Sequence, residues 1–203
     1  MEKKMSFYEV IDKRRTIRQF EQEEIPKEVL ERIIDAGLKA PSGGNKRECE
    51  LTVITDKDII LELAKFIFPR PLKIKDEPKT PQQEMFKIAI PRQKSMVEES
   101  TCIILVLYKQ KHSFTDPNNF GLMDYASAWA LIENILLAAT YEGLGTGIRV
   151  PLQKETQQIK DLMKIPHNYY LPAMIMLGYP PENALVPKRE PPDTKNKVHW
   201  NQW

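Results

Sequence analysis

Three arginines lie close together near the start of the chain, Arg14, Arg15 and Arg18, with the hydroxyl of Thr16 between them. Guanidinium groups bind a phosphate dianion through forked, charge-assisted hydrogen bonds, so this cluster is a candidate anion site. A second basic pair occupies positions 188–189 in a proline-rich stretch. For both groups the alternative is a basic turn that water solvates, as it solvates most surface charges.

Two glycine-containing segments could bring backbone close to a ligand. Residues 41–45 read Pro-Ser-Gly-Gly-Asn, which combines permissive backbone with a hydroxyl and an amide that can hydrogen-bond planar polar edges. Residues 143–147 read Gly-Leu-Gly-Thr-Gly and follow a predicted helix, where they offer exposed backbone N–H groups. This segment lacks both the spacing and the strand-first context of a dinucleotide-binding G-x-G-x-x-G turn. A turn or a helix stop is the alternative for each segment.

The residues that other chemistries need are missing or scattered. His112, His167 and His199 form no H-E-x-x-H motif and no grouping with cysteine at metal-ligand spacing, so we predict no metal site. The phosphate-binding G-x-x-x-x-G-K-[ST] loop and the G-x-S-x-G elbow of serine hydrolases are also absent. The two cysteines, Cys49 and Cys102, make neither a C-x-x-C pair nor a disulfide framework, which favours a reducing cytoplasm.

Composition narrows the class further. The chain has 203 residues and a formal net charge of +2 spread along its length, so nucleic acid is not expected as a partner. A chain of this length is expected to form a single domain over residues 1–203. Its opening residues lack the apolar core of a secretory signal, and its longest apolar run, 102–108, is too short to span a membrane.

The elements that must position these residues follow from periodicity and capping. Strands are predicted at 51–54, at 101–108, where an apolar run indicates a central strand, and at 171–177. Helices are predicted after Ser6, at about 26–38 with Pro26 as first helical residue, after Asp56, at 122–142 with Gly143 as its stop, and at 154–164 with Ile159, Leu162 and Met163 inward.

Two proline-rich segments are predicted to lie outside these elements. Residues 68–95 carry five prolines among many charges, a composition unsuited to helix or sheet interiors, and we expect a lid or a mobile excursion there. Residues 180–203 are expected to run extended over a surface.

Taken in order, these segments resemble the nitroreductase family of FMN-dependent oxidoreductases. The resemblance covers nearly the whole chain, although each motif alone is unspecific. Its motifs are Arg14-Arg15-Thr16-Ile17-Arg18-Gln19-Phe20, Ala40-Pro41-Ser42-Gly43-Gly44-Asn45, Asn134 to Ala139 continuing to Gly143-Leu144-Gly145-Thr146, Met176 to Pro180, Lys188-Arg189-Glu190-Pro191 and Val198 to Trp203.

The resemblance implies an α+β fold, in which a central, mostly antiparallel sheet is flanked by helices, within an intertwined homodimer that binds FMN at the subunit interface. By motif, the FMN phosphate would be held by Arg14, Thr16 and Arg189, together with Lys188, and Arg15 would also belong to the cofactor site. Arg18 would lie near the pyrimidine edge and favour the reduced flavin electrostatically. Pro41, Ser42, Gly43 and Asn45 would reach the ring from the other subunit, and the backbone of Gly145, Thr146 and Gly147 would face the ring edge that carries O4 and N5.

The resemblance further implies a cytoplasmic enzyme that takes hydride from NADH or NADPH and reduces nitroaromatic, quinone or similar conjugated acceptors by a ping-pong route. No catalytic side chain is assigned, because hydride transfer needs no acid or base from the protein. The alternatives are a reductive dehalogenase, a flavin-fragmenting enzyme, a non-catalytic FMN-binding sensor, and a basic interaction protein without cofactor.

One departure from the family pattern concerns the acceptor. After Asn45 this chain reads Lys46-Arg47-Glu48-Cys49, where many relatives are less charged. Our hypothesis is that Arg47 and the 68–95 segment set acceptor choice. Cys49 is interpreted as a small residue at the start of a strand rather than a redox group.

Overall fold

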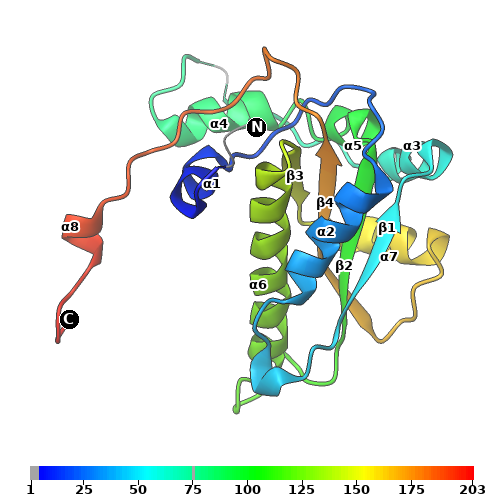
Figure 1. Cartoon of the computed structure of the whole chain (residues 1–203), viewed down its shortest axis with the longest axis vertical. Coiled ribbons are helices and arrows are strands. Elements are labelled where there is room, and N and C mark those ends of the chain that lie inside the picture. Colours follow the sequence, from blue (N-terminus) through cyan, green and yellow to red (C-terminus); the bar gives the residue numbers. More distant parts are fainter. Residues whose placement is uncertain (1–4, 75) are drawn as a thin grey trace.

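The computed structural model describes residues 5–74 and 76–203. The first four residues and residue 75, in the predicted lid segment, lie outside this description. A four-stranded sheet forms the centre, with strand order β1-β2-β4-β3 and every neighbouring pair antiparallel (Figure 1). Its strands are β1 (Cys49–Ile54), β2 (Cys102–Lys109), β3 (Gly145–Arg149) and β4 (Tyr169–Gly178).

Strand β2 is central because its side chains are apolar on both faces. Ile104 and Val106 point into a core formed with α2 (Lys27–Leu38) and α6 (Phe120–Tyr141). Ile103 and Leu105 point into a second core, formed with α3 (Lys57–Lys65), α5 (Ser95–Glu99) and α7 (Gln153–Leu162). The sheet thus lies between two helical layers, which confirms the predicted antiparallel α+β architecture.

Most predicted helices are confirmed, with their caps. Helix α1 (Phe7–Lys13) begins with a capping box between Ser6 and Glu9, and Asp56 accepts hydrogen bonds from the first turn of α3. Pro26 is the cap of α2 rather than its first helical residue, because its ψ of 139° is still extended. Gly143, at φ +83°, ends α6 in the left-handed region that glycine adopts without strain.

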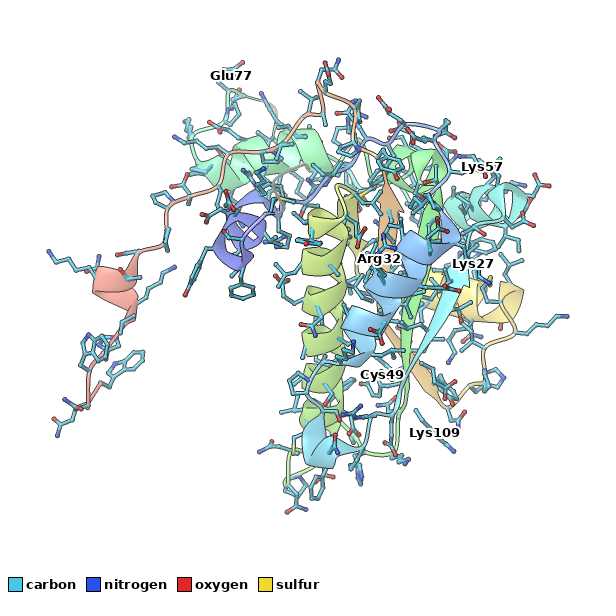
Figure 2. The ribbon with its side chains drawn as sticks, viewed as in Figure 1. Lys27, Arg32, Cys49, Lys57, Glu77 and Lys109 are labelled. Carbon is cyan, nitrogen blue, oxygen red and sulfur yellow. The ribbon has the colours of Figure 1, made fainter. Side chains whose placement is uncertain are left out.

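The C-terminal end of helix α6 is held against α2 by an ion pair. Arg32 of α2, labelled in Figure 2, donates two hydrogen bonds to Glu142, just past the end of α6, at 2.8 and 2.6 Å. By length and composition α6 is also apolar enough to cross a membrane, a possibility that the 102–108 run did not suggest. Its packing on α2 and on the sheet is that of a core helix, with Leu122 and Met123 left exposed at its start.

Four predictions about local structure are wrong. Residues 68–95 contain α4 (Pro81–Ala89), because Thr80 caps it and Pro81 stands at its first position, where proline is tolerated. Residues 145–147, expected to belong to a helix stop or an exposed backbone segment at 143–147, lie in strand β3. Leu162 is exposed, since Lys160 takes the inward place and donates to two backbone carbonyls of the next loop. The C-terminal tail contains a short helix, α8 (Thr194–Lys197), far from the body (Figure 1).

Candidate functional site

The predicted phosphate-binding residues gather around one pocket of about 310 Å³, the basic pocket. All six predicted residues of the two basic segments line it, together with Pro187 and with Met85 from α4: Arg14, Arg15, Thr16, Arg18, Lys188 and Arg189. Met85 was missed because the sequence of its segment was not interpreted as a helix. The pocket is therefore assembled from the end of α1, the C-terminal tail and α4.

Backbone pairing holds the N-terminal wall of this pocket in place. Ile17 donates to the carbonyl of Thr146 at 2.8 Å, which makes residues 16–18 a parallel extension of the sheet beyond β3. A Cβ atom on Gly147 would lie 2.7 Å from the Ile17 carbonyl oxygen and 2.6 Å from Met96 Sδ. Glycine is required there because the two chain segments approach too closely for any side chain.

Gly145, Thr146 and Gly147 are consequently buried in β3. The expectation that their backbone is exposed is wrong, because residues 16–18 cover them. Their proposed role of directing backbone N–H groups at a cofactor stays a prediction.

Arg189 fastens the tail to the end of α1. Its guanidinium donates to the carbonyl oxygens of Ile11, at 3.2 Å, and of Arg14. Leu185 of the same tail donates to Gln19 Oε1 at 2.8 Å. These contacts bring residues 187–189 to the arginine cluster although some 170 positions separate them in the sequence.

The pocket has an excess of positive charge. Burial, with Arg189 and Arg14 nearby, lowers the pKa of Arg15, and burial lowers the pKa of Arg18. Arg14 contacts one carboxylate, Glu133 of α6, at 3.3 Å. Arg18 Nη1 is buried and has no hydrogen-bond partner among the described residues. Crowded guanidinium groups and a buried unpaired donor fit an anionic ligand with hydrogen-bond acceptors, so these residues fit FMN.

Residues 41–45, the Pro-Ser-Gly-Gly-Asn segment, form an arm at the end of the molecule opposite α1 (Figure 1). Gly43 donates to Ser127 Oγ of α6 at 2.9 Å, and Arg47 donates through its backbone to Ser42 Oγ at 3.0 Å. Asn45 Oδ1 accepts from Arg47 Nε at 3.1 Å. The arm is drawn near the start of α6, away from α1 (Figure 1). Within one chain, the structure does not bring Pro41, Ser42, Gly43 or Asn45 to the basic pocket.

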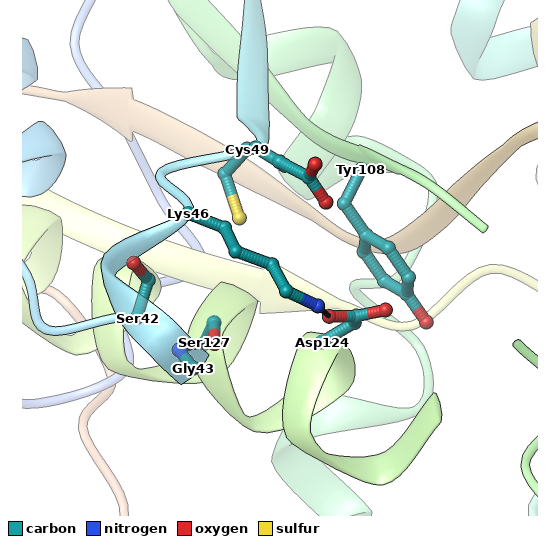
Figure 3. Close-up of a pocket in the computed structure, with 8 residues that line it drawn as sticks. Ser42, Gly43, Lys46, Cys49, Tyr108, Asp124 and Ser127 are labelled. Atoms are coloured by element: carbon teal, nitrogen blue, oxygen red, sulfur yellow. Dashed lines mark hydrogen bonds and ion pairs between the residues drawn. The ribbon is translucent and has the colours of Figure 1, made fainter. Parts of the chain in front are cut away.

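A small polar pocket lies beside the arm (Figure 3). Lys46 extends across it toward Asp124, with Nζ 3.7 Å from Oδ1. Burial raises the pKa of Cys49 to about 11, so the thiol stays protonated at neutral pH and behaves as a small packed residue. Its lining residues are Ser42, Gly43, Lys46, Glu48, Cys49, Tyr108, Asp124 and Ser127.

Three residues of this pocket were not predicted from the sequence: Tyr108, Asp124 and Ser127. Asp124 and Ser127 are among the few polar residues in the first half of an otherwise apolar helix, which is a signal that sequence reasoning could have used. Tyr108 ends the predicted central strand and gave no comparable signal. Among the described residues, no group of three or more His, Cys, Asp or Glu side chains could hold a metal ion.

Comparison with known proteins identifies the family. The sequence model of the nitroreductase family matches residues 11–179. The chain belongs to the nitroreductase family. It is 27% identical, over 98% of its length and 89% of the relative's, to a protein of Methanothermobacter thermautotrophicus provisionally named NADH dehydrogenase/NAD(P)H nitroreductase.

Two further nitroreductase relatives bear on function and fold. Human iodotyrosine deiodinase 1 is 27% identical over 95% of this chain and 68% of its own. The solved FMN-dependent nitroreductase of Clostridium difficile is 22% identical and has a TM-score of 0.69, covering 96% of this chain and 98% of its own. The first likeness adds a named dehalogenating activity among the relatives, and the second shows the fold. Nitroreductases are soluble enzymes, which favours the core-helix interpretation of α6.

Proposed function

We propose that this nitroreductase binds FMN, takes hydride from NADH or NADPH and reduces nitroaromatic, quinone or similar conjugated acceptors by a ping-pong mechanism. The observation that carries the proposal is the basic pocket, where six residues singled out from sequence converge around about 310 Å³ of space. Relatives named NAD(P)H nitroreductase and FMN-dependent nitroreductase support the donor and the cofactor.

Different residues of this chain would bind different parts of the cofactor. Arg14, Arg15 and Arg189 supply charge for the phosphate, and Arg189 also keeps the tail closed on α1. Arg18 offers its unpaired Nη1 to an acceptor oxygen or nitrogen of the ring system. Bound FMN would supply the two-electron redox chemistry. A fixed positive charge at Arg18 would favour the reduced state, because reduction adds negative charge to the ring.

We further propose a cytoplasmic homodimer in which the arm completes the partner's site. Large apolar side chains are exposed on α1, α6 and the tail, which favours a partner surface: Phe7, Tyr8, Leu122, Met123, Trp200 and Trp203. If each site combines the basic pocket of one chain with the arm of another, a basic-pocket variant and an arm variant complement each other. A mixed dimer of Arg14→Ala/Arg189→Ala with Ser42→Ala/Asn45→Ala then has one intact site and one doubly altered site. We expect one FMN per mixed dimer and weak binding to either parent dimer.

The experiment that tests the activity is an anaerobic visible spectrum of the FMN-loaded protein before and after NADH and then NADPH. Bleaching by either nucleotide, followed by recovery of the oxidised spectrum on adding a quinone, supports the proposal. A protein that neither nucleotide bleaches contradicts the nicotinamide-dependent reaction. A protein that fails to bind added FMN contradicts the cofactor assignment itself.

A second candidate function is reductive dehalogenation, favoured by the iodotyrosine deiodinases among the relatives. In this reaction two electrons and a proton replace a carbon–halogen bond with a carbon–hydrogen bond and release halide. Dithionite-reduced protein incubated with an iodinated phenol tests it directly. Iodide release coupled to flavin oxidation supports this candidate, and flavin that stays reduced excludes it for that substrate.

A further inference from the structure

The small polar pocket beside the arm contains two buried polar atoms that have no partner. Tyr108 is 2% exposed, and its hydroxyl has no hydrogen-bond partner among the described residues. The Asp124 side chain is 10% exposed, and its Oδ2 atom is likewise unpaired within the described part of the chain. Unmade hydrogen bonds of buried groups cost free energy, so a pocket with two of them is adapted to something that pairs them.

The neighbouring charges leave these two atoms available. Lys46 contacts Asp124 through the other carboxylate oxygen, Oδ1, at 3.7 Å, which is longer than a hydrogen bond. Glu48 is paired with Lys111. Ser127 already accepts from Gly43 and donates to the Met123 carbonyl. None of these neighbours therefore forms a hydrogen bond with Tyr108 Oη or with Asp124 Oδ2.

The chemistry of the two atoms defines what they can receive. A carboxylate oxygen only accepts hydrogen bonds, so Asp124 needs a donor. Burial and the neighbouring Tyr170 raise the pKa of Tyr108, so its hydroxyl stays protonated and can donate. One group that both donates and accepts, such as a hydroxyl or an amino group, satisfies both atoms at once.

The size of the pocket limits the ligand to one such group. The free space is about 10 Å³, roughly what a single water-sized group needs. The rest of a larger ligand must therefore lie outside, along the arm. Ser42 and Gly43 of the arm form one wall of the pocket, and under the proposed function this same arm reaches the flavin ring.

We propose that this pocket is a specificity subsite for the electron acceptor: it takes a single hydroxyl or amino group of a conjugated acceptor, which donates to Asp124 Oδ2 and accepts from Tyr108 Oη. The inference rests on the proposed function, because that function places the arm at the ring. A site built around such bonds discriminates against a ligand that lacks the donor, since the buried carboxylate is then left unpaired.

The test is a calorimetric titration of oxidised, FMN-loaded protein with 4-nitrobenzyl alcohol and with its methyl ether, which cannot donate. We expect the alcohol to bind about 10- to 100-fold more tightly, the range for a hydrogen bond to a charged group. Asp124→Asn is expected to reduce this preference to less than threefold, and Tyr108→Phe to reduce it in part. Asp58→Asn, an exposed carboxylate on α3, serves as the matched control and leaves the preference unchanged.

Steady-state kinetics with the same two compounds provides a second measurement, in which we expect the preference for the alcohol to appear in KM and not in kcat. Equal binding of both compounds to the native protein, or a preference that survives Asp124→Asn and Tyr108→Phe, means that the pocket holds an internal water only, and overturns the inference. Failure of nicotinamide to reduce the flavin overturns the proposed function instead, and the titration still decides whether the pocket selects donors.

Discussion

Replacing Arg18 by methionine is expected to stabilise the cofactor-free protein and to lower the midpoint potential of the FMN-loaded protein. Without FMN, Arg18 Nη1 is a buried donor with no partner among the described residues. An unpaired buried group costs about 1–3 kcal/mol, so its removal is expected to stabilise the cofactor-free protein by about 1–2 kcal/mol. For a domain of this size, that gain corresponds to an increase of roughly 2–8 °C in Tm.

With FMN bound, the same substitution removes a positive charge that favours the reduced ring. A hydrogen bond from a charged donor is worth about 1.5–3 kcal/mol, which for a two-electron couple is about 30–65 mV. We therefore expect the midpoint potential to fall by this amount. The assays are thermal unfolding with and without FMN and anaerobic potentiometric titration. Arg18→Lys is the matched control, since it keeps the charge but loses the forked geometry, and it is expected to lower the potential less.

Two results would refute this reasoning. A lower Tm for cofactor-free Arg18→Met would mean that the guanidinium is satisfied in solution. An unchanged potential, combined with a large loss of FMN affinity, would mean that Arg18 belongs to the phosphate grip and that our division of roles among the arginines is wrong.

Three further predictions concern the pocket, the core and the thiol. Arg14→Ala is expected to weaken FMN binding by about 1.5–3 kcal/mol in a fluorescence titration, whereas Glu133→Gln, which frees Arg14 from its 3.3 Å contact, tightens it. Glu155→Gln breaks a buried ion pair with Arg149 and is expected to cost about 3–5 kcal/mol in urea unfolding; a loss below 1 kcal/mol contradicts this. Cys49 is expected to resist iodoacetamide at pH 7–9 and to react as pH approaches its pKa of about 11. Because that pKa lies above the ordinary value for a thiol, the buried, protonated Cys49 contributes fully to stability below about pH 9, and this contribution declines as pH rises toward 11. Rapid alkylation of the native protein at pH 8 would contradict the burial of Cys49.

The sequence predicted the central elements because their signals are local. An apolar run marks β2, and Ser6 and Asp56 mark the starts of α1 and α3 through caps that need only neighbouring residues. The six basic-pocket residues were also found in advance, since cationic clusters are conspicuous in a chain of balanced charge. Their convergence depends on Arg189 binding carbonyl groups at the end of α1, which no local pattern reveals.

The features that were missed depend on tertiary contact. The glycines of residues 143–147 suggest a helix stop or exposed backbone, yet Gly145 and Gly147 allow residues 16–18 to approach strand β3. Helix α4 was hidden by the prolines around it, although Pro81 stands at a position that suits a helix start. Asp124 and Tyr108 become a pair of interest only when α6 and the end of β2 meet beside the arm.

The separation of the two pockets has a consequence for how substitutions combine. The basic pocket and the polar pocket have no lining residue in common, and they touch α6 at different places, Glu133 for the first and Asp124 with Ser127 for the second. Side chains without shared partners contribute almost independently to binding. Substitutions at Asp124 should therefore change acceptor selectivity with little effect on FMN affinity, and substitutions at Arg14 should do the reverse. This independence applies to Asp124 and Arg14 but not to Ser42 or Gly43, which line the polar pocket and, under the proposed function, also belong to the arm that completes the partner's FMN site.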